Sequence, residues 1–317
     1  MLDLVISGPT ANEAWIALIR RIYEDGAESR PRNLRIKELT CWTTQVDMRY
    51  PVVTVKRRKM GYRFMVAEAW WILTGRNDVM SLKSYSPHIA SFSNDGYRFD
   101  GAYGPKVVDQ LRYVVDTLER DPDSRQAVVS IWRSNPRDSK DVPCTLTLQW
   151  LIRDGKLHCV DTMRSSDAWL GWPYDVFNFS MLSAYVLLML REREHLSGGF
   201  KHTGFEFFNK IGLGALYLVA GSSHLYVNPK EDGATNVPYA MEDVQGILEA
   251  YGCVAPASND GRILLPYLEE WLIEYAPLNI DEFTSPGDLV RHLELVKDRQ
   301  DSGHQWLREL LLEEKKL

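Results

Sequence analysis

The chain has 317 residues, of which 45% are hydrophobic and 25% charged, and its formal net charge is −6. This composition is typical of a globular protein with a large core, and the length alone would allow two domains. The acidic balance leaves no basic stripe of the kind that binds a phosphate backbone, which argues against nucleic acid as a direct partner.

The four cysteines are spread along the chain without CxxC spacing, at Cys41, Cys144, Cys159 and Cys253. This pattern argues against both a disulfide framework and a metal site, and it favours a reducing cytoplasm. The start of the chain lacks the pattern of a secretory signal. The longest apolar run, residues 176–190, is shorter than the roughly 20 residues that a bilayer needs, so we expect a buried core helix and no membrane partner.

The first half of the chain alternates between helical and strand patterns. Apolar residues at helical spacing predict helices over residues 12–23, 60–73 and 107–120. Strands are expected over residues 35–44, 52–55 and 126–132. Residues 76–104 are rich in Ser, Asn, Asp and Gly and predict a long irregular stretch, which in a compact domain is often functional.

A hairpin is the strongest prediction in the middle of the chain. Residues 145–152 and 157–164 are rich in β-branched and large apolar types, and Asp154-Gly155 between them is a typical hairpin turn. Residues 213–227 predict a strand with an interruption at a Gly-Ser-Ser sequence. The remaining helices are expected at residues 242–251, 264–275, 286–296 and 304–312, after a boundary near residue 230.

Cys144 stands at the entrance of the hairpin, and Arg164 stands where its second strand ends. A lone cysteine is more often a small buried hydrophobe than a nucleophile. Here, however, the hairpin should bring the Arg164 guanidinium beside the sulfur and lower its pKa, which makes a thiolate nucleophile plausible. Glu68 lies in the apolar helix 60–73, and its position alone favours an exposed flank.

Several ordered motifs share one resemblance. Pro143-Cys144, Gln149-Trp150, Asp154-Gly155-Lys156-Leu157 and the run from Arg164 to Asp175, RSSDAWLGWPYD, resemble the signature of the folate-dependent thymidylate synthase family, PC…QF…DGKL…QRSxDxFLGLPFN. Further elements agree in order: YPVVTVKR at 50–57, AEAWWILTG at 67–75, AYG at 102–104, DPDSR at 121–125 and HLY at 224–226. The resemblance covers residues 12–229.

This family resemblance implies an α+β fold in which a mixed β-sheet forms the dimer interface and helices flank it. We expect a thymidylate-synthase-like catalytic domain over residues 1–230. Residues 231–317 would be a divergent helical C-terminal extension packed on the same domain.

The family's chemistry explains why a cysteine is needed. C5 of a pyrimidine becomes nucleophilic only after a nucleophile adds to C6, which Cys144 would do, and C5 then takes a one-carbon unit from 5,10-methylenetetrahydrofolate. Glu68 and Tyr103 would act beside Cys144 in catalysis, Glu68 by organising water and protons near the exocyclic atom.

The resemblance also implies binding residues for the nucleotide and the folate. The phosphate would be bound by Arg164, Ser165, Arg32 in preference to Arg30, and Arg125 from the second subunit of a homodimer. The sugar hydroxyl would be bound by His224 and Tyr226, and the folate by Asp167, the backbone of Gly171, Glu68 and Trp71. Taken singly, such residues are as often core or surface residues, and only the joint pattern favours these roles.

Two departures from the family pattern concern the base. Asp175 stands where the methyl-forming enzymes acting on deoxyuridylate carry Asn, and a carboxylic acid that donates to N3 and accepts from N4 matches cytosine. Thr145 replaces the histidine that follows the nucleophile in those enzymes. Both departures favour a cytosine nucleotide as the substrate.

Other departures concern the product. The stretch from Tyr85 to Tyr97 lacks the tryptophans that pack on folate, having Ile89 and Phe92 near those places, and the chain ends in EEKKL instead of a short apolar tail. A wetter site would let water add to the exocyclic carbon and give a hydroxymethyl group. Gln126 stands where the family has a second arginine, so the expected phosphate site has one positive charge fewer.

The leading hypothesis is therefore a homodimeric cytoplasmic hydroxymethyltransferase that converts dCMP, or CMP, to its 5-hydroxymethyl derivative. Retention of Arg125 and Ser165 favours dCMP. The alternatives are a methyl-forming synthase acting on dUMP or dCMP and, from another class, an inactive nucleotide-binding paralogue. The intact set of Cys144, Arg164, Asp167 and Glu68 argues against the inactive paralogue.

Overall fold

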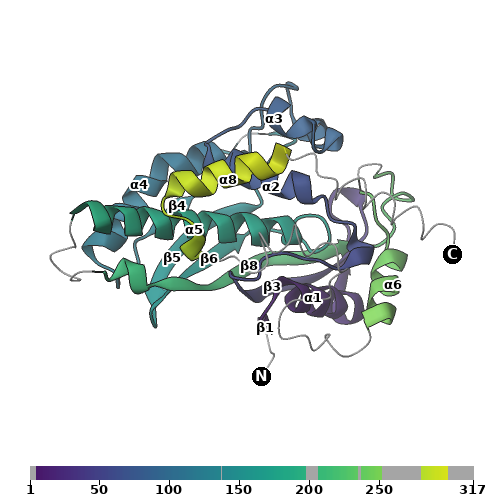
Figure 1. Ribbon diagram of the computed structural model, residues 1–317. Helices are drawn as coiled ribbons and strands as arrows, with labels where there is room; N and C mark the ends of the chain where they lie inside the picture. Colours follow the sequence, from purple (N-terminus) through teal and green to yellow (C-terminus); the bar gives the residue numbers. More distant parts are fainter. Residues whose placement is uncertain (1–4, 137, 198–205, 235–236, 252–279, 299–317) are drawn as a thin grey trace.

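The computed structural model describes residues 5–136, 138–197, 206–234, 237–251 and 280–298 (Figure 1). Its strands form one mixed eight-stranded sheet with the order β1-β3-β8-β6-β5-β4, with β2 paired to β3 and β7 to β8. The strands are β1 (Val5–Gly8), β2 (Ala27–Ser29), β3 (Ile36–Asp47), β4 (Val128–Ser130), β5 (Thr145–Arg153), β6 (Lys156–Met163), β7 (Ser166–Asp167) and β8 (Gly212–Tyr226). The predicted α+β class, with a mixed sheet flanked by helices, is confirmed.

The hairpin predicted in the middle of the chain is formed by β5 and β6, which pair antiparallel from Arg153 and Lys156 outward. Asp154 and Gly155 turn the chain with φ of 51° and 70°, the left-handed values that a two-residue hairpin turn requires. Beyond the hairpin β6 runs parallel to β8. The hairpin therefore places the start of β5 and the end of β6, Thr145 and Met163, side by side.

The long strand β8 runs through the Gly-Ser-Ser sequence without a break, so the predicted interruption is wrong. A Cβ at Gly221 would lie 2.9 Å from the backbone oxygen of Arg164. Glycine at this point lets β8 pass close to the chain that leaves β6, and the strand continues.

Residues 52–55 form no strand in the described structure, and this prediction is also wrong. The segment is buried, and two of its backbone groups bond side chains in place of a β-ladder. The Thr54 N–H donates to Asn12 Oδ1 at 2.8 Å, and the Val53 carbonyl accepts from the Tyr62 hydroxyl at 3.1 Å. An apolar β-branched run predicts burial correctly here but not pairing.

The first helices begin and end near the predicted residues. They are α1 (Ala11–Asp25), α2 (Tyr62–Leu73) and α4 (Gly104–Arg120), and α1 begins with a capping box in which Thr10 and Glu13 bond each other's backbone N–H groups. Between α2 and α4 the chain is irregular apart from α3 (Met80–Lys83) and a 3₁₀ turn at Pro87–Phe92.

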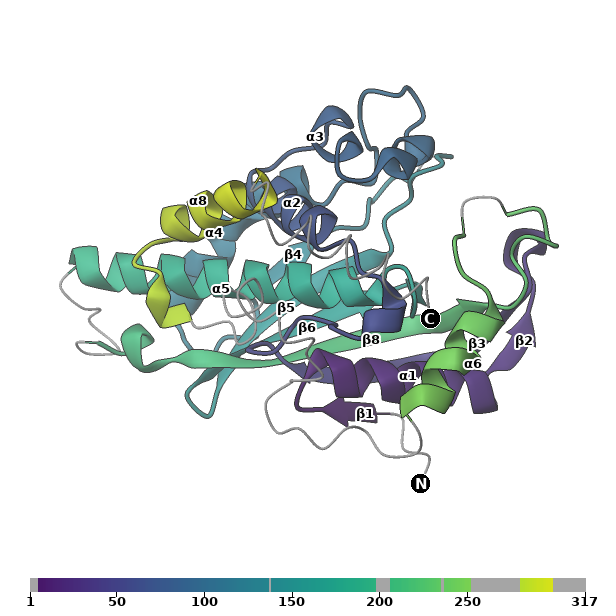
Figure 2. The same ribbon diagram turned by 45° about the vertical axis from the view of Figure 1, so that its right-hand side comes forward.

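The central helix α5 (Trp172–Ser197) is longer than predicted and forms the core of the fold. It is the one helix in the described ranges whose length and composition would suit a membrane, but 78% of its most apolar window is buried inside the protein. It lies between the sheet and a layer made of α2, α4 and α8 (Pro286–Asp298) (Figures 1 and 2). The predicted core helix is therefore confirmed, and it connects the sheet with the outer helices.

One face of the sheet is covered by α1 and α5. Two neighbouring inward residues of β3 mark this face: Arg21 of α1 stacks on Trp42, and the indole N–H of Trp172 in α5 donates to Thr44 Oγ1 at 2.8 Å. Side chains at the alternate positions, such as Val160 and Val219, point to the opposite face and are half-buried.

Two described helices follow β8, namely α6 (Met241–Tyr251) and α8. The last turn of α8 is attached to α2, because Arg63 donates to the Lys297 carbonyl at 3.2 Å and the Lys297 ammonium lies 4.4 Å from the Trp70 ring. The helices predicted at residues 264–275 and 304–312 lie outside the described residues. The boundary near residue 230 stays a prediction.

Candidate active site

A cavity of about 190 Å³ opens between α2, α5 and the start of β5, and we call it the catalytic pocket. Its lining includes five residues that the sequence singled out: Cys144, Glu68, Tyr103, Trp71 and Asp175. Glu68 and Trp71 belong to α2, and Tyr103 directly precedes α4. Cys144 lies in the loop before β5, and Asp175 lies in the first turn of α5. Because these segments are far apart in sequence, only the fold brings them to one cavity.

Cys144 lies directly before β5 and is half-buried. Its sulfur lies 3.7 Å from Arg164 Nη2 and 3.8 Å from Ser165 Oγ, so the predicted position of the guanidinium beside the sulfur is confirmed. Arg164 lowers the pKa of the thiol as predicted, but the net shift of that pKa is upward, against the prediction. Burial raises the pKa of Cys144, and this outweighs the lowering by Arg164, while Asp175 raises the pKa further.

The Arg164 side chain is fixed by the loop that precedes Cys144. Its Nε donates to the Pro143 carbonyl at 2.9 Å and its Nη2 to the Val142 carbonyl at 3.0 Å, and Nη1 bonds Ser165 Oγ at 3.1 Å. The guanidinium is nevertheless exposed to solvent. It therefore combines a fixed position with a free face that can meet an anion.

Glu68 lines the catalytic pocket, so the exposed flank expected from its position is wrong. Its carboxylate accepts a hydrogen bond from Asn178 Nδ2 at 2.8 Å. Burial raises the pKa of Glu68 to about 7, and the Asn178 bond lowers it only in part. A carboxyl with this pKa can hold or release a proton near neutral pH.

Asn178 lines the catalytic pocket and was not among the predicted site residues, because it lies within the apolar run 176–190 that predicts a core helix. Its Oδ1 is buried and has no hydrogen-bond partner among the described residues. The available signal was its spacing: Asp175 and Asn178 are three residues apart in the first turns of α5, and residues with this spacing lie on one face of a helix.

Asp175 stands in the first turn of α5, where its backbone N–H donates to the Gly171 carbonyl at 3.0 Å. A Cβ built on Gly171 would lie 3.3 Å from the Asp175 carboxylate, so the absence of a side chain there leaves room for this carboxyl. Burial, and then the nearby carboxyls of Glu68 and Asp167, raise the pKa of Asp175 well above its ordinary value. The pocket therefore favours the un-ionised acid at this position.

Tyr103 closes the pocket beside the nucleophile. Its hydroxyl accepts from the Thr145 backbone N–H at 3.2 Å, and its ring stacks on Phe179 of α5 at 6.2 Å between centroids. Burial raises the pKa of Tyr103, so the hydroxyl stays protonated and is available as a donor.

An apolar wall forms another side of the catalytic pocket. It includes Trp71, Leu82 and Phe99, together with Ile89 and Phe92, the two residues expected near the places of the family's folate-packing tryptophans. Trp71 meets Phe99 edge to face at 5.8 Å, and its indole N–H donates to the Asp78 carbonyl. Such a wall fits a flat heteroaromatic ring such as a pterin.

The predicted sugar and phosphate residues Arg32, His224 and Tyr226 form a second group. Arg32 Nη2 lies 3.4 Å from the Tyr226 hydroxyl, and the His224 and Tyr226 rings meet edge to face at 5.5 Å. Arg32 itself is exposed and adopts a left-handed φ of 54°. Arg30, the alternative, instead acts electrostatically on Asp232.

Asp167 and Gly171 have their polar groups engaged in the turn before α5. Asp167 Oδ1 accepts from the backbone N–H groups of Trp169 and Leu170, and the Gly171 N–H donates to the Asp167 carbonyl at 3.0 Å. The hydroxyl of Tyr239 also lies 3.3 Å from Asp167 Oδ1, a contact that the sequence reasoning missed because Tyr239 lies beyond the motif region.

Arg125 stands apart from both groups and is exposed. Its backbone carbonyl accepts from Gln149, a half-buried residue on the face of β5 opposite the core, at 2.8 Å. In the part of the chain that the structure describes, Arg125 is thus held at the edge of the sheet face opposite α1 and α5, and it does not line the catalytic pocket.

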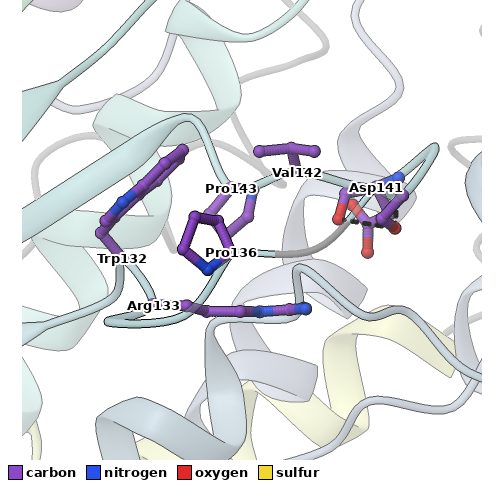
Figure 3. A pocket seen from close by; sticks show the side chains of 7 residues that line it. Trp132, Arg133, Pro136, Asp141, Val142 and Pro143 are labelled. Carbon is purple, nitrogen blue, oxygen red and sulfur yellow. Dashed lines mark hydrogen bonds between the residues drawn. The ribbon is translucent and has the colours of Figure 1, made fainter.

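A second, smaller pocket borders the catalytic one (Figure 3). It is lined by Trp132, Arg133 and Pro136 and shares Asp141, Val142 and Pro143 with the catalytic pocket. Asp141 Oδ2 accepts from the Gly101 N–H at 2.6 Å, which ties the loop before Cys144 to the loop before α4.

Comparisons with known proteins agree with this geometry. The model of the family described as thymidylate synthase matches residues 13–205. A deoxyuridylate hydroxymethyltransferase of Bacillus phage SP01 is 28% identical over 265 residues, which are 76% of this chain and 63% of that protein. The chain thus spans less than two thirds of the length of this relative. The chain belongs to the thymidylate synthase family.

Proposed function

We propose that the protein is a pyrimidine nucleotide C5-hydroxymethyltransferase that acts on dCMP or CMP. The family match supports one-carbon transfer to a pyrimidine nucleotide, and the name of the phage relative supports hydroxymethyl transfer. The cytosine base is the part that rests on this chain's own residues. The single observation that carries it is that the Asp175 carboxyl lines the same cavity as Cys144, where burial raises its pKa.

Cys144 is the nucleophile in this proposal. Its thiolate adds to C6 of the pyrimidine, which makes C5 nucleophilic. Since burial raises the pKa of the free thiol, the proposal requires that the thiolate forms when substrate and Arg164 share the pocket. Bound 5,10-methylenetetrahydrofolate would supply the one-carbon unit, and Trp71, Ile89 and Phe92 would hold its pterin.

Asp175 would read the edge of the base. As an acid it donates to N3 of cytosine and accepts from the N4 amino group, which an asparagine in the orientation used for uracil does not do. A protonated carboxyl that holds its proton at neutral pH is what this donation needs, and the pKa shift of Asp175 is in that direction.

Glu68 and Asn178 would organise the water that becomes the hydroxyl group. Their hydrogen-bonded pair faces the same pocket, and a Glu68 pKa of about 7 allows it to take a proton from that water. The wall at Ile89 and Phe92 covers the site less completely than large indole rings would, which favours water addition at the exocyclic carbon. The polar sequence EEKKL, residues 313–317, which replaces the family's apolar tail, lies outside the described residues.

The nucleotide phosphate would be bound by Arg164, Ser165 and Arg32, with Arg125 supplied by the second subunit of a homodimer. Support for the dimer comes from the half-buried face of the sheet, where Gln149 holds Arg125 at the edge. His224 and Tyr226 would bind the sugar, and Asp167 and Gly171 the folate. In this proposal dCMP is the preferred nucleotide and the protein is located in the cytoplasm.

Deoxyuridylate is a second candidate substrate, because the name of the phage relative specifies it. An un-ionised carboxyl can also rotate, so that its carbonyl oxygen accepts a hydrogen bond from the N3–H of uracil and its O–H group donates one to O4. This candidate uses the same pocket and the same nucleophile. The two candidate substrates differ only in the base edge, cytosine or uracil, to which Asp175 would hydrogen-bond.

Base preference tests the proposal. The specificity constants for dCMP, CMP and dUMP with methylenetetrahydrofolate are measured for the protein and for Asp175→Asn. We expect a cytosine nucleotide to be preferred, and the variant to shift the preference toward dUMP by about tenfold or more, since one mismatched hydrogen bond costs on the order of 1–3 kcal/mol. Preference for dUMP in the unmodified protein supports the second candidate and contradicts the first.

A further inference from the structure

Asp161 is a fully buried carboxyl that none of the roles above uses. It lies on the inward face of β6, where its neighbours at alternate positions are Leu157, Cys159 and Met163. Its side chain is 0% exposed, and neither carboxyl oxygen has a hydrogen-bond partner among the described residues. Thr145 Oγ1, which is likewise buried and unpartnered, lies close enough to lower the pKa of Asp161 without completing a bond of good geometry.

The position of Asp161 is costly for stability. A carboxyl buried without partners loses its hydration and gains no hydrogen bond in return, whereas an apolar side chain of similar size would pack there without that cost. Costly groups of this kind in a core need an explanation other than packing.

The surroundings of Asp161 connect it with the catalytic pocket. Thr145 directly follows Cys144, and α5, which carries Asp175, packs on β6. The Asp175 carboxyl acts on Asp161 electrostatically and raises its pKa, in addition to the larger effect of burial. Glu68 raises the pKa of Asp175 in the same way. The carboxyls of Glu68, Asp175 and Asp161 therefore form an electrostatically coupled series.

We propose that Asp161 is a positioning residue whose buried and unpartnered carboxyl, on the strand that α5 packs against, stabilises the charge that Asp175 acquires during addition of Cys144 to the base. This inference rests on the proposed function. In the step concerned, the S–C6 bond forms, the C5–C6 π electrons shift toward N3, and the Asp175 proton moves to N3. The negative charge of the thiolate thereby ends on the Asp175 carboxylate. An O–H dipole nearby in a dry site is well suited to stabilise that charge.

The test uses release of tritium from C5 of labelled dCMP and CMP, which reports addition at C6. Asp161→Leu removes the dipole, and Asp161→Asn keeps a donor of the same shape. We expect the leucine variant to release tritium about tenfold more slowly or worse at saturating nucleotide with an unchanged KM, and the asparagine variant to stay within about threefold of the unmodified protein.

Stability separates this role from a structural one. The leucine variant should unfold at the same or a higher urea concentration, because it removes an unpartnered polar group from the core. If it does not fold, Asp161→Ala takes its place. Tritium release at the unmodified rate in the apolar variants overturns the inference, as does an equal loss in the asparagine variant. Absence of tritium release from any pyrimidine nucleotide in the unmodified protein overturns the proposed function itself.

Discussion

At the residue scale, the pocket is distinguished by carboxyls that hold their protons. Glu68, Asp175 and Asp161 all have raised pKa values, chiefly because they are buried. Since each neighbouring charge makes the next ionisation harder, the series keeps acids available near neutral pH. A cytosine ring, which has an acceptor at N3, needs such a donor.

The raised pKa of Glu68 has a consequence for stability. Between the ordinary value of 4.5 and about 7 the unfolded chain has lost the Glu68 proton while the folded protein keeps it. The contribution of Glu68 to the free energy of unfolding therefore falls by about 3 kcal/mol as the pH rises through this window, and it is constant above the window.

Glu68→Gln should remove that part of the pH dependence. We expect the variant to lose less stability than the unmodified protein between pH 5 and pH 8, measured by urea unfolding at both pH values. Glu24→Gln, at an exposed glutamate of α1, is the matched control and should leave the dependence as it is. An unchanged difference between the two pH values in Glu68→Gln would show that Glu68 is not buried as described.

At the element scale, the hairpin and α5 position the chemistry. The hairpin could be predicted from its apolar runs and its Asp-Gly turn, and with it the contact between Arg164 and Cys144. The direction of the Cys144 pKa shift could not, because burial of the sulfur depends on α2 and α5, which are remote in sequence. The position of Glu68 in the pocket could not be predicted either, because it depends on how α2 packs against α5.

Other errors at this scale have local causes. Residues 52–55 have strand composition, but Asn12 and Tyr62 satisfy their backbone groups. The Gly221 sequence has the composition of a turn, but the glycine serves a close approach between strands. In both cases a distant contact overrides a local preference.

Helix α8 supports the outer side of α2, which carries Glu68 and Trp71. Leu293 of α8 is 0% exposed, whereas Leu295 on the same helix is 59% exposed. We expect Leu293→Ala to lower the free energy of unfolding by about 2–5 kcal/mol and Leu295→Ala to change it by less than about 0.5 kcal/mol, measured by urea unfolding. Equal effects of the two substitutions would contradict the packing of α8.

At the scale of the whole molecule, the proposed active site would be completed by a second chain. Within the described residues, Arg125 is held at the edge of the sheet face opposite α1 and α5, and it does not line the catalytic pocket. A pocket whose phosphate group needs this arginine would therefore be formed only when a second copy covers that face. The family resemblance predicted this arrangement, and a single chain does not reveal it.

Complementation between two inactive variants tests the shared site. Arg125→Ala lacks the donated arginine and Cys144→Ser lacks the nucleophile. A mixed dimer contains one pocket with both groups, so co-expression should restore about a quarter of the unmodified activity. Each variant purified alone is the control. Absence of recovery when mixed dimers are present would place Arg125 outside the phosphate site.

The central claim is that a cytosine nucleotide receives a hydroxymethyl group at C5. Identification of the product by mass spectrometry, with dihydrofolate followed by absorbance, tests it most directly. After incubation with dCMP or CMP and methylenetetrahydrofolate, we expect a 5-hydroxymethylcytosine nucleotide and no dihydrofolate. A methylated product accompanied by an equal amount of dihydrofolate would contradict it.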